Sequence, residues 1–105
     1  MIKFEDLKKA ELKIAKIIEA EEIANSEKLL KLQIDLGGEK RQIIAGIKKT
    51  YNYKELIGKE IVVVTNLEPR VMMGFESQGM LLAVDDNGPV LLRPDREVPP
   101  GSSIS

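Results

Sequence analysis

The chain has 105 residues, of which 43% are apolar and 31% are charged. This length suits one domain, and the apolar share is enough for a compact core, which excludes a disordered chain. No run approaches the roughly 18 consecutive apolar positions of a membrane span, and the charged N-terminus is unlike a signal peptide. The absence of cysteine excludes disulfides and thiolate metal sites. We therefore expect a single domain, residues 1–105, that works in the cytoplasm without contacting a membrane.

Histidine is absent too, which removes the commonest general base and metal ligand of enzymes. Every Ser-His-Asp or Cys-His catalytic scheme is excluded with it. The formal net charge is −1, from 16 basic and 17 acidic side chains, so no global field attracts nucleic acid. A site for a polyanion must therefore be a local patch. We predict that the chain is not an enzyme and that it uses no cofactor and no metal ion.

A short helical turn and a long strand are predicted at the N-terminal end. Phe4 and Leu7 are three residues apart and lie on one side of a turn within residues 1–10. From Leu12 to Ala20 the apolar period changes to two, which is typical of a strand. The side chains expected on its buried face are Leu12, Ile14, Ile18 and Ala20.

The clearest strand spans residues 30–36, where leucine and isoleucine alternate strictly with polar residues. Gly37-Gly38 then predicts a hairpin turn, and residues 41–45 form the returning strand. The remaining elements are a helical stretch within 48–57 that ends at Gly58, a strand over 61–64, a loop over 67–77, a strand over 80–84, a turn over 85–88, a short strand over 90–92 and a proline-containing tail.

Three strands, a helix and two further strands are the plan of the OB-fold, an all-β, five-stranded barrel. Element counting alone leaves an unrelated small α+β sandwich as the alternative. On the barrel interpretation, the N-terminal turn and a C-terminal extension over about residues 88–105 lie outside the five strands.

Ligands of OB-folds usually meet strands two and three, flanked by the loops that join strands 1–2 and 4–5. Here those loops are residues 23–28 and 67–77. The basic residues in reach are Lys28, Lys31, Arg41 and Arg70. We interpret Lys28 and Arg70 as phosphate contacts, with a hydrogen bond from Ser77; the alternative is that these are ordinary solvated charges.

Residues 66–80 resemble the signature of a known family. The matching positions are Asn66-Leu67-Glu68-Pro69-Arg70, then Gly74, then Glu76-Ser77-Gln78-Gly79-Met80, with further matches at Ser26-Glu27-Lys28-Leu29 and at Arg41-Gln42-Ile43-Ile44-Ala45-Gly46. Together they resemble the tRNA-binding domain found at the C-terminus of many methionyl-tRNA synthetases, in small tRNA-binding proteins and in endothelial monocyte-activating polypeptide II. The resemblance runs from about Phe4 to Gly101.

The resemblance implies an OB-fold, tRNA binding and homodimer formation. It adds two residues to the expected tRNA contacts, which become Lys28, Lys31, Arg41, Asn66, Arg70, Ser77 and Met80. One departure stands out: Val71, Met72 and Met73 replace lysine or arginine residues that are common in the family. The remaining cations must then carry more of the binding, and the methionines offer flexible apolar contact to a nucleobase or a partner.

We therefore interpret the chain as a non-catalytic module that holds tRNA by its shape and backbone, in support of the catalytic part of a methionyl-tRNA synthetase. One alternative is a purely structural dimerisation module, and another is a chaperone-like peptide binder.

Apolar residues outside the five strands predict a symmetric dimer, because a large exposed apolar patch is unusual on a monomer. The expected interface residues are Phe4, Leu7, Val90, Leu91, Leu92 and Val98. The alternative is that they cover the ends of the barrel.

Overall fold

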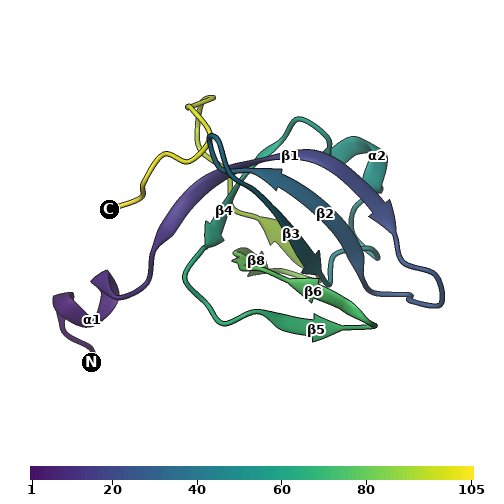
Figure 1. Ribbon diagram of the computed structural model, residues 1–105, viewed down its shortest axis with the longest axis horizontal. Helices are drawn as coiled ribbons and strands as arrows, with labels where there is room; N and C mark the ends of the chain where they lie inside the picture. Colours follow the sequence, from purple (N-terminus) through teal and green to yellow (C-terminus); the bar gives the residue numbers. More distant parts are fainter.

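The computed structural model describes residues 1–105, and its centre is a curled antiparallel sheet (Figure 1). The elements are α1 (Phe4–Lys8), β1 (Leu12–Glu22), β2 (Leu30–Asp35), β3 (Lys40–Ala45), α2 (Tyr53–Leu56), β4 (Glu60–Val64), β5 (Arg70–Met72), β6 (Phe75–Ser77), β7 (Met80–Leu81), β8 (Ala83–Asp85) and β9 (Pro89–Leu91). Five strands are bonded in the order β3-β2-β1-β4-β7. This arrangement is the predicted OB-fold. Neither helix is long and apolar enough to cross a membrane.

Strand β1 curls the sheet because its two halves pair with different neighbours. Residues 12–16 pair with β4, and residues 16–22 pair with β2. The register shifts between Ile17 and Glu19, as at a β-bulge, which bends a strand. The prediction that Ile18 belongs to the buried face is therefore wrong: Ile14, Ala15 and Ile17 are buried, while Ile18 is half-exposed.

The core lies inside the curl and follows the predicted alternation most closely in β2. Leu30, Leu32 and Ile34 are fully buried there, while the residues between them are half-exposed. The core cluster consists of Ala15, Ile17, Leu30, Leu32, Ile34, Leu36, Ile43, Ala45, Ile47, Leu56, Ile61, Val63 and Leu91. Burial of these side chains is the main stabilising contribution to the barrel.

The barrel closes between β3 and the segment after β6 through side chains as well as backbone. Gln42 N–H donates to Gln78 Oε1 over 3.0 Å, and Gln78 N–H donates to the Gln42 carbonyl over 2.8 Å. Ile44 N–H donates to Ser77 Oγ over 2.9 Å. Backbone groups on the outer edge of β3 therefore have hydrogen-bond partners although no regular strand is paired with that edge.

Residues 67–77 contain a hairpin where the sequence predicted a loop. Strands β5 and β6 are joined by Met73 and Gly74 alone, with φ angles of 51° and 81°. A two-residue turn with positive φ at both positions suits the twist of a hairpin, but it favours Asn-Gly rather than Met-Gly. The sequence therefore carried no turn signal strong enough to reveal this hairpin.

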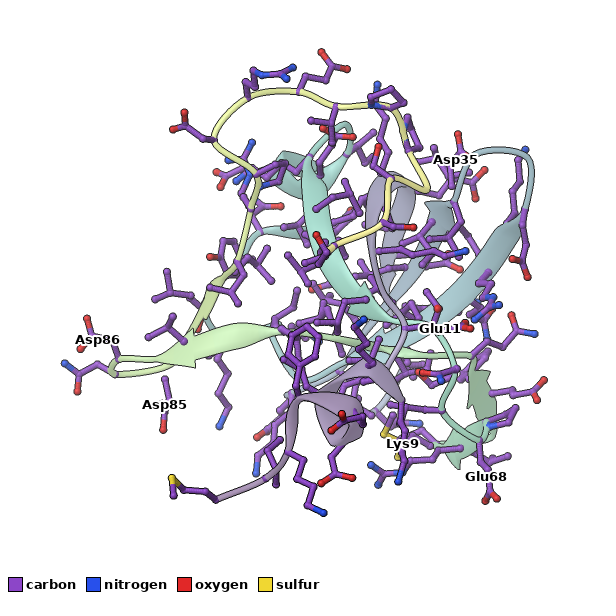
Figure 2. All side chains as sticks on the ribbon, turned by 90° about the vertical axis from the view of Figure 1, so that its left-hand side faces the viewer. Lys9, Glu11, Asp35, Glu68, Asp85 and Asp86 are labelled. Atoms are coloured by element: carbon purple, nitrogen blue, oxygen red, sulfur yellow. The ribbon has the colours of Figure 1, made fainter.

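The strand predicted over residues 80–84 is divided in two. β7 pairs with β4 in the barrel, whereas β8 pairs with β9 in a separate hairpin. Figure 2 shows this hairpin extending from the barrel on the left of the view, with Asp85 and Asp86 near its tip. The β8–β9 hairpin belongs to the surface rather than to the closed sheet.

The C-terminal tail is bonded to the barrel. Gly101 N–H donates to the Ile14 carbonyl over 2.7 Å, and Ile14 N–H donates to the Ser102 carbonyl over 2.9 Å. Val98 N–H donates to Glu60 Oε1 over 2.8 Å. The tail thus covers one edge of β1, so much of the predicted extension is part of the fold.

Candidate nucleic-acid interface

Lys28 lies in the loop between β1 and β2, where it is exposed and forms no ion pair. The loop is shaped locally, because Ser26 Oγ accepts a hydrogen bond from Leu29 N–H over 3.0 Å. Met73, at the tip of the β5–β6 hairpin, lines a shallow hollow of about 490 Å³ together with residues 25–29. The two loops predicted to flank the site therefore meet.

Arg70 is the first residue of β5, and it too is exposed and free of ion pairs. Arg70 is paired with Ser77, and Met72 with Phe75. Since alternate residues of a strand face opposite sides, these four side chains share the face toward the barrel, while Val71 points to solvent. Arg70 therefore lies at the open end of the inner hairpin face, where its charge is available to an anion.

Lys31 on β2 already interacts with a carboxylate and an aromatic ring of the same chain. Its Nζ lies 2.7 Å from Glu21 Oε1 and 4.4 Å from the centre of the Phe75 ring. The carboxylate compensates the positive charge, and the aromatic face adds a cation–π contact. Lys31 therefore fastens the hairpin to β2, and Phe75 is folded onto the barrel.

Arg41 on β3 is likewise bound within the protein. Its guanidinium donates to the Thr65 carbonyl and, over 2.9 Å, to Glu39 Oε2. This hydrogen bond and the positive charge of Arg41 lower the pKa of the Glu39 carboxyl below its ordinary value. The charge of Arg41 is thus partly neutralised before any ligand arrives.

Asn66 and Ser77 make hydrogen bonds that hold the fold. Asn66 Oδ1 accepts from Glu11 N–H over 2.8 Å, and its Nδ2 donates to the Lys9 carbonyl over 2.6 Å. Ser77 is 3% exposed, and besides accepting from Ile44 its hydroxyl donates to the Gly79 carbonyl over 3.0 Å. We therefore leave both residues out of the proposed tRNA contacts.

Met80 opens onto an apolar hollow of about 550 Å³, which we call the Met80 hollow. Its lining residues are Ile44, Leu67, Glu68, Arg70, Met72, Ser77, Gly79 and Met80. Met80 itself is 47% exposed. The sequence singled out Met80, Arg70 and Met72 separately, but nothing in the spacing of Leu67 or Ile44 indicated that they share one hollow.

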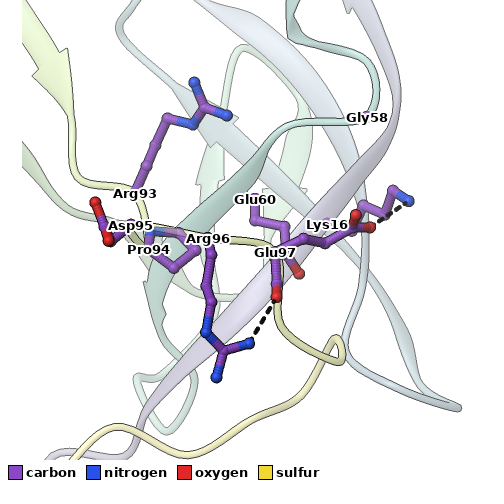
Figure 3. A pocket seen from close by; sticks show the side chains of 8 residues that line it. All are labelled: Lys16, Gly58, Glu60, Arg93, Pro94, Asp95, Arg96 and Glu97. Carbon is purple, nitrogen blue, oxygen red and sulfur yellow. Dashed lines mark hydrogen bonds and ion pairs between the residues drawn. The ribbon is translucent and has the colours of Figure 1, made fainter.

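A polar hollow of about 420 Å³ lies between the tail and the barrel (Figure 3). Lys16 Nζ lies 3.6 Å from Glu97 Oε1 there, while Arg93 and Arg96 face the same space with Glu60. Glu60 is 5% exposed, with Oε1 bonded to the tail and Oε2 unpaired. The structure contains no group of three or more potential metal-ligating side chains. The polar hollow is therefore part of the contact between the C-terminal tail and the barrel.

The residues predicted to form a dimer interface differ in their burial: some are exposed and others are buried or half-buried. Leu91 is buried in the core, so its assignment to the interface is corrected: consecutive residues of β9 point to opposite sides. Val98, which is part of the C-terminal tail, is half-buried. Val90 and Leu92 are exposed, as are Phe4 and Leu7 of α1.

The sequence comparisons identify the chain's relatives. Residues 12–103 match the family model described as "Putative tRNA binding domain". The chain is 54% identical over 104 residues to a methionine–tRNA ligase from Methanococcus aeolicus, and 54% identical over 105 residues to one from Thermotoga maritima. Each match covers 99% of this chain but only 16% and 17% of the two relatives. The chain therefore spans about a sixth of the length of these enzymes.

Two solved structures share the fold across the whole chain. The MetRS-related protein from Pyrococcus horikoshii has a TM-score of 0.92 and 36% identity, covering 100% of this chain and 98% of its own. A protein from Bacillus anthracis described as the chaperone CsaA has a TM-score of 0.91 and 37% identity, with coverage of 100% and 99%.

Proposed function

The chain belongs to the tRNA-binding domain family, and we propose that it holds tRNA non-specifically through the phosphate backbone, as a module without catalytic activity of its own. One observation carries this proposal: Lys28 on the β1–β2 loop and Arg70 on the adjacent β5–β6 hairpin are exposed cations without carboxylate partners. Lys31 and Arg41, in contrast, are already paired with Glu21 and Glu39. Phosphate contacts position a nucleic acid but do not read its sequence.

The relatives support a role in aminoacylation. Methionine–tRNA ligases contain a segment similar to this chain as a small part of their length. We propose that this chain likewise raises the local concentration of tRNA for the catalytic part of a methionyl-tRNA synthetase, in the cytoplasm. A tethered or associated binding module does this by making the second binding event effectively intramolecular.

Replacing either free cation should weaken tRNA binding. We expect Lys28→Ala and Arg70→Ala each to raise the Kd several-fold, equally for different tRNA species, because each removes a phosphate contact. Each should also flatten the log–log salt dependence by roughly 0.7–0.9. Filter binding over a range of salt concentrations measures both effects.

Lys54→Ala is the matched control, because Lys54 is an exposed lysine without an ion pair on α2. It should leave both the Kd and the slope at their wild-type values. Wild-type affinity and slope in both Lys28→Ala and Arg70→Ala would refute the proposed site.

A second candidate function is suggested by the similarity to the protein described as the chaperone CsaA. The Met80 hollow has an apolar lining that an unfolded chain could also contact. Competition between labelled tRNA, duplex DNA and an unfolded protein separates the two functions. Preference for the unfolded protein over tRNA would favour the chaperone function.

We further propose that the chain forms a symmetric homodimer. Helix α1 has five residues and buries none of them, and isolated helices of this length are unstable in water. Phe4 and Leu7 are 68% and 53% exposed. Val84 and Val90 are paired across the outer face of the β8–β9 hairpin and are also exposed. A second copy that covers these faces would bury the apolar surface and stabilise α1.

Light scattering should give twice 11.7 kDa for the wild-type chain. The double variant Phe4→Ser, Val90→Lys should be a folded monomer, because neither side chain belongs to the core. Ile57→Lys, at a residue 53% exposed outside both faces, should remain dimeric. A monomeric wild-type chain at micromolar concentration would contradict the dimer.

A further inference from the structure

We propose that the Met80 hollow receives one unpaired nucleobase of the bound RNA. This inference rests on the proposed tRNA binding and adds a base contact to the phosphate contacts. The hollow lies between the inner face of the β5–β6 hairpin, the segment before it and the start of β7. Its apolar lining residues are Leu67, Met72, Met80 and Ile44 of β3, of which Ile44 is 4% exposed.

The charges of the lining determine which part of an RNA fits inside. Arg70 and Glu68 are the only charged residues that line the hollow, and neither forms an ion pair. The other lining residues are uncharged, and Arg70 lies at the open end of the inner hairpin face, so a phosphate finds its cation at the rim of the hollow rather than inside it. An uncharged planar base fits such a lining, while its own phosphate remains outside within reach of the Arg70 guanidinium. In Figure 2, Glu68 lies beside the β5–β6 hairpin and points toward solvent.

The side chains of the hollow also suit a base rather than the bulky side chain of a fixed partner. Methionine is flexible, and its polarizable sulfur makes favourable contacts with aromatic rings. Two of the chain's four methionines line this one hollow. Phe75, the other candidate for stacking, is held under the Lys31 ammonium. The hollow is therefore the part of this face where a base can be buried against apolar atoms.

The experiment follows the methyl groups of the methionines by NMR, with ¹³C-methyl methionine in the full chain. The ring current of a bound base should shift the Met72 and Met80 signals upfield when tRNA is added. Met1, at the exposed N-terminus, is the internal reference. Inorganic polyphosphate, which has phosphates but no bases, should leave the Met80 signal in place even where it binds Lys28 and Arg70.

A binding measurement on two variants completes the test. Met80→Ser should raise the Kd for tRNA about two- to tenfold, because it removes the contact between the methionine sulfur and the aromatic ring of the base. Its salt slope should stay at the wild-type value, because no phosphate contact is lost. Val71→Ser is the matched control: Val71 is 72% exposed on the outer face of the same hairpin and does not line the hollow.

The outcomes separate this inference from the proposed function. Unmoved Met72 and Met80 signals, together with tRNA binding that depends on Lys28 and Arg70, would overturn the inference and leave the proposed function standing. Failure of the wild-type chain to bind tRNA would overturn both. If an apolar peptide shifts the Met80 signal and tRNA does not, the hollow is a peptide site and the inference is wrong.

Discussion

Gly101→Ala is expected to lower the free energy of unfolding by about 2–4 kcal/mol, because the tail crosses the end of β2 at backbone contact distance. A Cβ at position 101 would overlap the carbonyl oxygen of Leu36. Gly101 also has a φ of +88°, a conformation that side chains other than glycine rarely adopt. The tail would have to move away, which would break two hydrogen bonds: the one that Gly101 N–H donates to the Ile14 carbonyl and the one that Ile14 N–H donates to the Ser102 carbonyl.

Urea denaturation at a fixed protein concentration measures this effect. Gly46→Ala is the matched control, since no atom lies within 4 Å of its added Cβ and its φ is not positive. Its stability should change by less than about 0.5 kcal/mol. Equal stability of the two variants would mean that the tail does not lie against β2 as the structure shows.

The parts of the fold that could be predicted are those in which one strand buries one face. β2 alternates from Leu30 to Ile34 with a core on one side only, so its pattern is sufficient. β1 is different, because a bulge after Ile17 changes which side chains face inward. The β5–β6 hairpin was missed since Met73 occupies a position with positive φ that usually takes asparagine or glycine.

The sequence could likewise predict only some of the cations that are free for a ligand at the candidate site. Lys28 and Arg70 were predicted from their loops, and their exposure supports the proposal. The sequence could not show that Arg41 is bound to the carbonyl of Thr65, because this contact joins residues 24 positions apart. Which cations remain free for a ligand is decided by such tertiary contacts.

The residues of the proposed dimer surface could be predicted only in part, because an apolar run in the sequence does not show which of its side chains face the core. Val90, Leu91 and Leu92 form one apolar run, but a strand presents neighbouring side chains to opposite sides. Leu91 accordingly lies in the core, and its N–H donates to the Tyr51 hydroxyl over 3.1 Å. Leu91 of this run therefore belongs to the core, while Val90 belongs to the proposed interface. Only the pairing of β8 with β9 shows which of the two faces inward.

Ser77→Ala is expected to reduce stability by about 1–3 kcal/mol while leaving tRNA affinity unchanged. The hydroxyl is the only acceptor bonded to Ile44 N–H in the closure of the barrel, and a buried donor left without a partner costs about that much. Although Ser77 is among the residues that line the Met80 hollow, it is 3% exposed and its hydroxyl is bonded to Ile44 and Gly79, so the substitution removes no group that is free to bond RNA. Urea denaturation gives the stability, and filter binding at a temperature well below unfolding gives the affinity.

Ser103→Ala provides the comparison, since Ser103 is exposed and its hydroxyl forms no hydrogen bond. It should match the wild-type chain in both measurements. The opposite pattern in Ser77→Ala, with full stability but weakened tRNA binding, would restore Ser77 to the binding site. It would also require the hydroxyl to leave Ile44 and Gly79 when RNA binds, so that the closure of the barrel and the binding of RNA would compete for the same group.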